Sequence, residues 1–357
     1  MRVALKYGMC VHWNEFSVKL PFVFFFPAVG KARNMGDCIL FDCDTGSDDA
    51  IALMLLLSQR DRVTPVAVTC VGGNTSLENV VMNNLRILKL FGMLGKVPLY
   101  RGSGEPLVPV HQPSCASHVH GNDGMGGRPD VHPAASRDLL QYVEKEHAAD
   151  AIVRISKEHV GNLKVVATGP LTNLALAVKL DPELPKRLSG VYIMGGTRSG
   201  QGNVTATAEF NFYFDPESVW ITMYKYPPHC PVHLIDWEFT LKYASPWEWY
   251  DSWLSDKTND KSNFAKMALL PLERAMRKRG RKGAALCDAY AMAIALCDEI
   301  ASKPRDVRLV VELGGYYSRG SITLDDYHRH ENSFGFVRLY DDFDLEAYHK
   351  LLENALK

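Results

Sequence analysis

Short apolar runs alternate along the chain with longer stretches that are rich in helix-forming residues. Residues 38–41, 63–71 and 163–167 have the length and composition of buried strands, and each run ends in a turn that contains Asp or Gly. The stretch after the first run, residues 50–57, is apolar and built from good helix formers. Strands and helices that alternate in this way predict a parallel sheet with helices on both faces. We therefore expect a single α/β domain with an open, mostly parallel sheet.

The same reasoning predicts the remaining elements. Further strands are predicted at residues 97–100, 190–194, 232–236, 308–313, 321–324 and 334–339. Further helices are predicted at residues 75–91, 136–147, 149–159, 216–224, 260–279 and 344–356, and others begin after residues 173 and 283. No linker, composition shift or internal repeat separates these elements, so we expect one domain over residues 36–357.

Four aspartates follow the first predicted strand within eight residues, namely Asp42, Asp44, Asp48 and Asp49. In open α/β sheets ligands bind at the carboxyl ends of the strands. Like charges this close repel each other, and oxygen ligands suit hard cations such as Ca²⁺ and Mg²⁺. The alternative is an acidic turn in which Asp48 caps a helix and Asp49 favours its dipole, but this leaves Asp42 and Asp44 unexplained. We therefore favour a divalent metal site.

Composition excludes some classes of partner. The 357 residues are 46% hydrophobic and 23% charged, which is ordinary for a globular protein with a sizeable core. Forty basic and 41 acidic residues leave a net charge of -1, so bulk charge gives no support to a nucleic-acid or membrane partner. The eight cysteines are scattered and form no CxxC pair, which favours a reducing compartment. We expect a cytoplasmic protein.

The first 35 residues differ from the rest. Residues 18–29 are apolar, but this run is too short to span a bilayer and contains Pro21 and Pro27. No clear signal-peptide cleavage site follows, and Met35 lies just before the first predicted strand. We expect residues 1–35 to be a poorly ordered leader or an extension from an upstream start codon, with secretion as the alternative.

Three later features are open to more than one interpretation. Residues 101–133 form a long Gly-, Pro- and His-rich stretch that is either a lid beside the crevice or a solvated surface loop. Residues 277–283 are strongly basic, which is more typical of a solvated helix end than of a nucleic-acid site. Asp288 stands alone among apolar residues; burying a carboxylate is costly unless it is paired or metal-bound, although Asp288 could also cap a helix.

The sequence Asp-Cys-Asp-Thr-Gly-Ser-Asp-Asp at residues 42–49 resembles the N-terminal signature of the inosine-uridine-preferring nucleoside hydrolase family. Further matches follow in the family's order at residues 71–75, 118–121, 167–173, 194–196, 208–211 and 287–289. They span most of the chain, and only the leader has no counterpart. Members of this family hydrolyse the N-glycosidic bond of ribonucleosides to free base and ribose, on an open α/β fold with bound Ca²⁺.

The resemblance implies how the metal is held. Asp44 would bind Ca²⁺ and act as the general base on the attacking water. The other ligands would be the carboxylates of Asp49 and Asp288 and the backbone carbonyl of Thr168. Asp42 would lie behind this set and orient it.

The resemblance also implies a ribose site. Asp48 would bind the 2′-hydroxyl group, with Asn74 nearby. Glu209 and Asn211 would bind the 5′ side, and Met194 would line the face of the sugar. General chemistry agrees with this assignment, because bond cleavage passes through an oxocarbenium-like state that carboxylates stabilise, and a metal lowers the pKa of its bound water.

The sequence departs from the family where the leaving base would lie. Other branches carry a histidine or a tryptophan just before the last aspartate, whereas this chain has Cys287 and resembles a third, cysteine-bearing branch. A thiol of ordinary pKa is a weak acid for this task, so His120 is a further candidate. Arg274, Arg277 and Arg281 could bind the 6-oxo group and N7 of a purine, which favours inosine and guanosine. Each arginine could equally lie on a solvated helix face.

Two other functions fit parts of the pattern. A phosphatase of the haloacid dehalogenase type also ends a strand in Asp-x-Asp, but its signature continues Gly-Thr, whereas Thr45-Gly46 follows here. A non-catalytic nucleoside-binding protein would keep the pocket, although the complete acidic set argues against it. The family resemblance further implies a homodimer or homotetramer.

Overall fold

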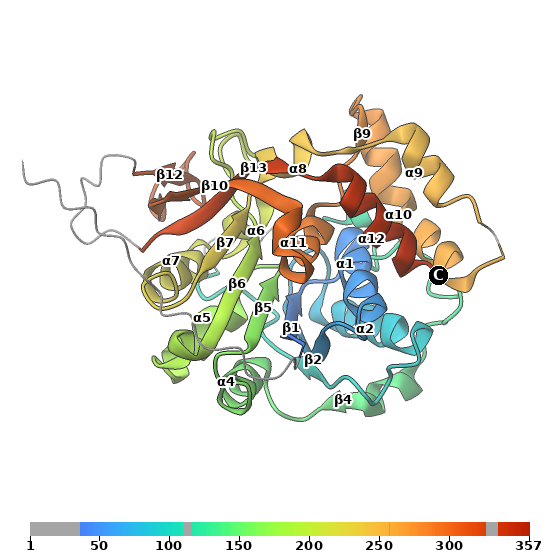
Figure 1. Cartoon of the computed structure of the whole chain (residues 1–357), viewed down its shortest axis with the longest axis horizontal. Coiled ribbons are helices and arrows are strands. Elements are labelled where there is room, and N and C mark those ends of the chain that lie inside the picture. Colours follow the sequence, from blue (N-terminus) through green and yellow to red (C-terminus); the bar gives the residue numbers. More distant parts are fainter. Residues whose placement is uncertain (1–35, 110–115, 257, 326–334) are drawn as a thin grey trace, which may run out of the picture. The chain divides into compact units, whose positions relative to one another are not determined.

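A nine-stranded sheet forms the centre of the structure, a computed structural model that describes residues 36–109, 116–256, 258–325 and 335–357. Its strands lie in the order β10-β13-β7-β6-β5-β1-β2-β3-β4, and every neighbouring pair is parallel except β10 and β13 (Figure 1). The pairs β8–β9 and β11–β12 form two separate small sheets. The strands are β1 (Cys38–Cys43), β2 (Thr64–Cys70), β3 (Leu99–Arg101), β4 (Val143–Glu144), β5 (Leu163–Ala167), β6 (Leu188–Met194), β7 (Val232–Ile235), β8 (Ser245–Pro246), β9 (Gly283–Ala284), β10 (Ala301–Val307), β11 (Leu309–Val311), β12 (Ile322–Leu324) and β13 (Val337–Phe343).

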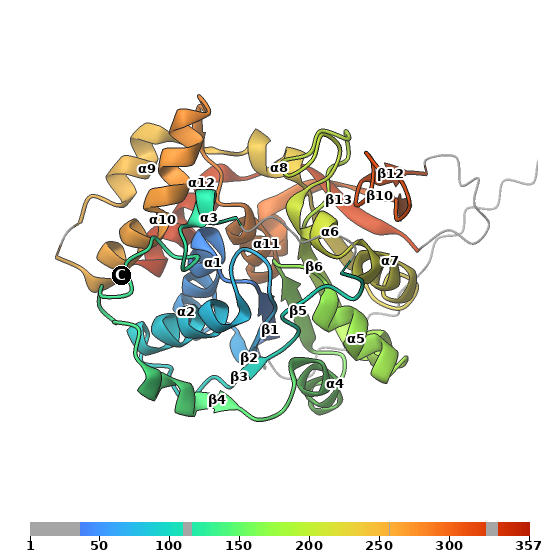
Figure 2. The same ribbon diagram turned by 180° about the vertical axis from the view of Figure 1, so that it is seen from behind.

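Helices cover both faces of the central sheet, as predicted (Figures 1 and 2). One apolar core lies beneath α1, α2, α10, α11 and α12, and a second lies beneath α4, α5 and α7. The helices are α1 (Ser47–Ser58), α2 (Leu77–Leu90), α3 (Ser117–His120), α4 (Ala148–Glu158), α5 (Thr172–Leu180), α6 (Phe210–Phe214), α7 (Pro216–Lys225), α8 (Trp237–Lys242), α9 (Trp247–Trp253), α10 (Asp260–Lys278), α11 (Cys287–Leu296) and α12 (Leu345–Ala355), with 3-10 turns at Arg137–Tyr142, Leu184–Arg187 and Asp298–Ile300.

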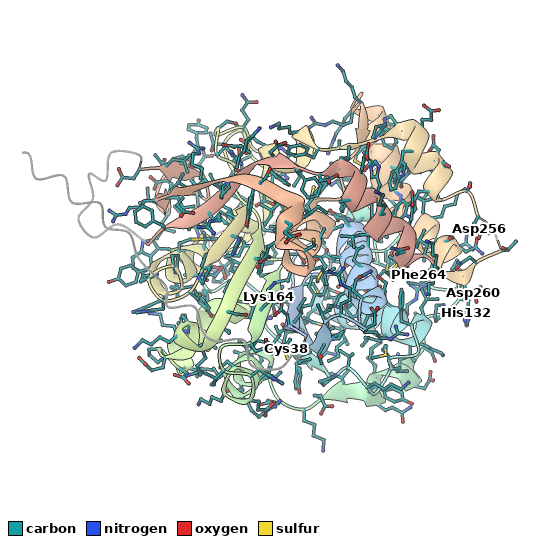
Figure 3. All side chains as sticks on the ribbon, viewed as in Figure 1. Cys38, His132, Lys164, Asp256, Asp260 and Phe264 are labelled. Atoms are coloured by element: carbon teal, nitrogen blue, oxygen red, sulfur yellow. The ribbon has the colours of Figure 1, made fainter. Side chains whose placement is uncertain are left out.

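The central strand β1 is buried along its whole length, which explains its continuous apolar sequence. It lies between β2 and β5, and the register places Asp42 beside Thr69 on one side and Ala167 on the other. The carboxyl ends of these three strands therefore meet at one edge of the sheet. Cys38 and Lys164 mark the opposite, amino ends of β1 and β5 (Figure 3).

Two predicted elements differ in the structure. The helix predicted at residues 136–147 is a 3-10 turn followed by β4, because only Leu139 of the turn is buried and no apolar helix face exists. The helix predicted from residue 284 begins at Cys287, since Gly283–Ala284 pairs with β8 instead.

The C-terminal strands also differ from expectation. The predicted strands at 308–313 and 321–324 form the small β11–β12 sheet rather than extending the central one. The edge strand β10 was not predicted, because its middle is polar, exposed and contains Pro304, which an edge strand tolerates. None of the helices in the described ranges is long and apolar enough to cross a membrane. The predicted leader, residues 1–35, lies outside the described residues.

Candidate active site

The turn between β1 and α1 holds the acidic cluster at the carboxyl edge of the sheet. Helix α1 begins at Ser47, which places Asp48 and Asp49 in its first turn, where negative charge favours the helix dipole. The Asp49 carboxylate accepts a hydrogen bond of 2.9 Å from the Gly46 amide and so caps the helix. Asp44 lies in the turn itself and is buried.

Asn74 fixes the Asp44 carboxylate through two hydrogen bonds. Its two carboxylate oxygens accept hydrogen bonds from the Asn74 amide, at 2.7 Å, and from the Asn74 side chain, at 3.1 Å. Burial and the neighbouring charge of Asp49 hold the pKa of Asp44 well above its usual range.

Asp42 lies one layer deeper, in β1. Its Oδ1 accepts hydrogen bonds from Thr69 Oγ1, at 2.5 Å, and from Asn173 Nδ2, at 2.8 Å. Its Oδ2 is buried without a hydrogen-bond partner, and burial raises the pKa of Asp42 to about 7. Asn173 belongs to a motif noted in the sequence, but neither it nor Thr69 was given a role there. The signal for Asn173 was its position just after a predicted strand end.

Two neighbouring carboxylates of this turn meet a third one from a distant part of the chain. One oxygen from each of Asp48, Asp49 and Asp288 lies within 4.8 Å of the others, although Asp288 is in α11. The predicted metal set included Asp44 in place of Asp48, so the closest trio differs from that set by one residue. Thr168, after β5, donates its hydroxyl to Asp49 at 2.6 Å, and its carbonyl accepts a hydrogen bond of 2.7 Å from Asn211.

The charge of this cluster is not balanced by the protein. Among the described residues no Lys or Arg forms an ion pair with these aspartates, and the nearest basic group is His120 Nδ1, at 3.9 Å from Asp48. Burial, followed by the charge of Asp48, raises the pKa of Asp49 to about 6 and that of Asp288 well above its usual range. Buried carboxylate and carbonyl oxygens with unbalanced charge fit a hard divalent cation.

A cavity of about 720 Å³ opens above the cluster. Seven residues predicted from the sequence as metal or ribose ligands line it: Asp48, Asn74, Thr168, Met194, Glu209, Asn211, Asp288. The predicted ligands Asp44 and Asp49 do not line it, whereas His120 and Cys287 do. The structure thus brings together residues from seven separate segments of the chain.

Glu209 and Asn211 are fixed where β6 and α6 approach each other. The Glu209 carboxylate caps α6 and accepts hydrogen bonds from the amides of Asn211, at 2.9 Å, and Gly196, at 2.8 Å. Burial raises the pKa of Glu209 to about 7. The Asn211 side chain also donates to the Met194 carbonyl at 3.2 Å, so its orientation is set by two carbonyl groups.

His120 and Cys287 flank Asp48 on the other side of the cavity. His120 Nδ1 accepts a hydrogen bond of 3.1 Å from the Ser47 amide, which leaves the proton of the neutral ring on Nε2. Burial lowers the pKa of His120 to about 4. The Cys287 amide donates to Asp48 Oδ2 at 3.1 Å, and burial and the charge of Asp48 raise the pKa of the Cys287 thiol.

The candidate arginines do not share one environment. Arg277 pairs with Asp251 and Glu273 on the exposed side of α10, and neither Arg277 nor Arg274 lines the cavity. Arg281 does line it, together with Arg279 and Lys282. The three cavity residues follow the end of α10, and of these three only Arg281 was a candidate in the sequence.

Apolar side chains complete the cavity wall. Val119, Phe210, Trp237, Leu272 and Met276 line it, which provides surface on which a planar base can stack. The sequence interpretation missed these residues, because each comes from a helix whose inward face is set by packing.

The fold is shared with solved structures of nucleoside hydrolases. A solved structure described as "Inosine-Guanosine Nucleoside Hydrolase (IG-NH)" is similar with a TM-score of 0.79 and 29% identity, covering 90% of this chain and 98% of that one. The model of the inosine-uridine preferring nucleoside hydrolase family matches residues 39–350, and the chain belongs to this family. The resemblance noted in the motifs and the predicted fold class are thereby confirmed.

Curated relatives carry different substrate names. The inosine-uridine preferring nucleoside hydrolase of Crithidia fasciculata is 36% identical over 184 residues, which is 51% of this chain and 55% of the relative. The pyrimidine-specific ribonucleoside hydrolase RihB of Escherichia coli (strain SE11) is 33% identical over 180 residues, 50% of this chain and 54% of the relative. The chain thus spans about half the length of the curated relatives it matches.

Proposed function

We propose that the protein is a Ca²⁺-dependent ribonucleoside hydrolase that cleaves the N-glycosidic bond to free base and ribose. One observation carries the proposal. The carboxylates of Asp48, Asp49 and Asp288 form an unbalanced acidic cluster that opens, through Asp48 and Asp288, into a cavity that also carries Glu209 and Asn211. A carboxylate-rich cavity of this kind suits a sugar that becomes positively charged as its bond to the base breaks.

Asp49, Asp288 and the Thr168 carbonyl would hold the ion, with Asp44 beside them. When bound, Ca²⁺ supplies the charge that keeps these carboxylates ionised and lowers the pKa of the attacking water. Asp44 would accept a proton from the attacking water as general base. Both nitrogens of Asn74 donate hydrogen bonds to its carboxylate, which fixes the orientation of the carboxylate oxygens.

The ribose is held by groups that are themselves fixed. Asp48 accepts from the 2′-hydroxyl group, and the Cys287 amide holds the Asp48 carboxylate in place. Glu209 and Asn211 bind the 5′ side, each oriented by backbone groups. Preorganised charge that faces the developing oxocarbenium ion lowers the barrier without reorganisation during the reaction.

The base leaves on the side of His120 and Cys287. His120 offers one proton, on Nε2, because Nδ1 is already an acceptor. The raised pKa of the Cys287 thiol makes it a poor acid. His120 is therefore the preferred contact to the leaving base.

We propose purine nucleosides of the inosine and guanosine type as the preferred substrates. The apolar wall offers stacking surface, and Arg279 and Arg281 offer donors for a 6-oxo group and N7 in the place first considered for Arg274 and Arg277. The similar solved structure is described as an inosine-guanosine nucleoside hydrolase, which supports a preference for purine nucleosides.

The test is hydrolysis of inosine, guanosine, uridine, 2′-deoxyinosine and p-nitrophenyl phosphate with Ca²⁺ present, measured as free ribose and free phosphate. We expect ribose from inosine and guanosine, and a loss of about 10⁴-fold in kcat/KM for 2′-deoxyinosine, because a site built to bind a hydroxyl rejects its absence. Nucleoside binding without ribose release would identify a binding protein instead. Faster release from uridine would refute the purine preference alone.

We further propose, from the family resemblance, that the protein is a homodimer or homotetramer. Light scattering of the purified chain would give the mass of two or four copies. A monomer at micromolar concentration would contradict this.

A further inference from the structure

One face of α2 carries a row of polar side chains that reaches the segment after α3. Asn79, Asn83 and Arg86 are spaced four and three residues apart, which places them on the same side of the helix. All three donate side-chain hydrogen bonds to main-chain carbonyls of residues 122–133. We call these three residues the α2 polar row.

The contacts of Arg86 are unusual for an arginine. Its side chain is 1% exposed and makes no ion pair within the described residues. Its Nε donates to the Pro133 carbonyl at 2.7 Å, and one terminal nitrogen donates to the carbonyls of Val131, at 3.0 Å, and Arg128, at 3.1 Å. The guanidinium also lies over the Phe264 ring of α10, labelled in Figure 3, at 5.2 Å. Burying a guanidinium group costs free energy unless its N–H groups have partners, and here the carbonyls supply them. These hydrogen bonds therefore hold the segment against α2.

The same segment is wedged between α2 and α10. Met125 is fully buried in the core. Gly124 and Gly126 have φ of +78° and +87°, and a Cβ atom on them would lie 2.6 Å from the Thr75 side chain and 2.4 Å from the Met267 carbonyl. The part of the predicted lid stretch that follows His120, residues 121–133, is therefore held against α2 and α10 around Met125, although it does not itself line the cavity. We call residues 121–133 the wall.

Asn83 joins this wall to the catalytic turn. Its side-chain nitrogen donates to the Asp123 carbonyl at 2.8 Å and to the Thr45 carbonyl at 3.1 Å. His120 precedes the wall directly, and its carbonyl accepts a hydrogen bond of 3.0 Å from the Gly126 amide. Its ring contacts the same turn through Ser47. The wall and the turn are thus tied at two points, through the Asn83 side chain and through His120 itself.

We propose that Asn83 and Arg86 are positioning residues for His120. By holding the wall against the turn, they keep the His120 ring beside Asp48 and presented to the cavity, where the leaving base would meet its Nε2 proton. This rests on the proposed function, since it assigns His120 to the leaving base. Neither residue touches the substrate cavity itself.

The test is a double-mutant cycle between His120→Ala and Asn83→Ala, with Asn84→Ala as the matched control. Asn84 is the next residue of α2 and is also buried, but it donates to Cys43, Cys70 and Val80 and does not reach the wall. We expect Asn83→Ala to lower kcat for inosine about tenfold with little change in KM, and to have no further effect once His120 is alanine. Asn84→Ala should lower Tm yet show no coupling to His120.

Hydrogen exchange gives a second readout that does not depend on activity. Amides of residues 121–127 should exchange faster in Asn83→Ala and in Arg86→Met than in Asn84→Ala, and Arg86→Lys should restore part of the protection. Full additivity of Asn83→Ala and His120→Ala, or unchanged exchange in the wall, would overturn the positioning role. If His120→Ala itself kept wild-type kcat while inosine was still hydrolysed, the leaving-base assignment would fail instead, and the exchange result would still decide whether the α2 polar row holds the wall.

Discussion

The aspartates after β1 differ in their partners, and the partners separate their roles. Asp42 faces Thr69 and Asn173 inside the sheet, where it ties β1 to β2 and to the start of α5. Asp44, within the turn itself, accepts hydrogen bonds from the two nitrogens of Asn74. A carboxylate with few internal partners remains available to accept a proton from water.

Replacing Asp44 with Asn should remove nearly all turnover. The amide cannot accept the proton of the attacking water, and loss of a general base costs about 10²–10⁴-fold in rate. The measurement is kcat for inosine, with the exposed Asp138→Asn as control. Wild-type kcat in Asp44→Asn would show that another group is the base.

Arg281→Gln should lower kcat/KM for inosine and guanosine about tenfold, because one good hydrogen bond to a base is lost. Uridine should be affected less. Arg277→Gln is the matched control, since Arg277 lies on the same helix end but pairs with Asp251 and Glu273. Equal losses in both variants, or for all three nucleosides, would argue against base recognition by Arg281.

At the scale of elements, the site depends on α11 lying against α1 and the carboxyl end of β1. Both helices are buried on nearly all sides, and α11 presents a run of alanines that allows close approach. Their packing, rather than any local motif, brings Asp288 to Asp48 and Asp49.

Ala291→Leu in α11 should therefore destabilise the fold by about 1–3 kcal/mol, because extra methylene groups have no room in a close-packed interface. Urea unfolding would measure this. We also expect weaker Ca²⁺ binding, since a shift of α11 moves Asp288. The exposed Ala134→Leu should change neither quantity.

Ca²⁺ should stabilise the protein more at pH 8 than at pH 5. The pKa of Asp49 is raised from 3.8 to about 6, so its protonated form favours the fold below pH 3.8, and this contribution is lost as pH rises through about 6. Ca²⁺ replaces the lost protons and competes with them at low pH. Ca²⁺ at 100 times its Kd stabilises by about 2.7 kcal/mol.

Thermal unfolding with and without Ca²⁺ would measure this difference at the two pH values. A shift of equal size at both, or an undiminished shift in Asp288→Asn, would contradict the proposed ligand set.

At the scale of the molecule, the site contacts that the structure describes lie within Gly36–Lys357, which form one compact unit. A chain that begins at Met35 should keep the Tm and the kcat for inosine of the full chain within error. Thermal unfolding and ribose release from both chains would test this. A large fall in either would show that residues 1–35 contribute to the folded enzyme.

Much of the fold was predictable because hydrophobic periodicity reports which residues are buried. The strand at residues 163–167 was placed to the residue, since it is apolar except for Lys164 and is followed by Thr168-Gly169. The edge strand β10 was missed, because an exposed polar strand has no such pattern. The helix predicted at 136–147 was wrong for the opposite reason, since Leu140 and Tyr142 stay exposed and only Leu139 of the 3-10 turn is buried.

The sequence by itself determined the acidic turn after β1, because its four aspartates are neighbours in the chain and a strand end is a local feature. The sequence by itself also indicated the family, because the family's motifs follow one another along the chain in the expected order. Only the tertiary structure decided that Asp288 joins this turn, that Asn173 supports Asp42, and that Arg281 rather than Arg277 faces the cavity. These depend on how helices pack on the sheet, and helix packing is set by contacts between residues far apart in the chain.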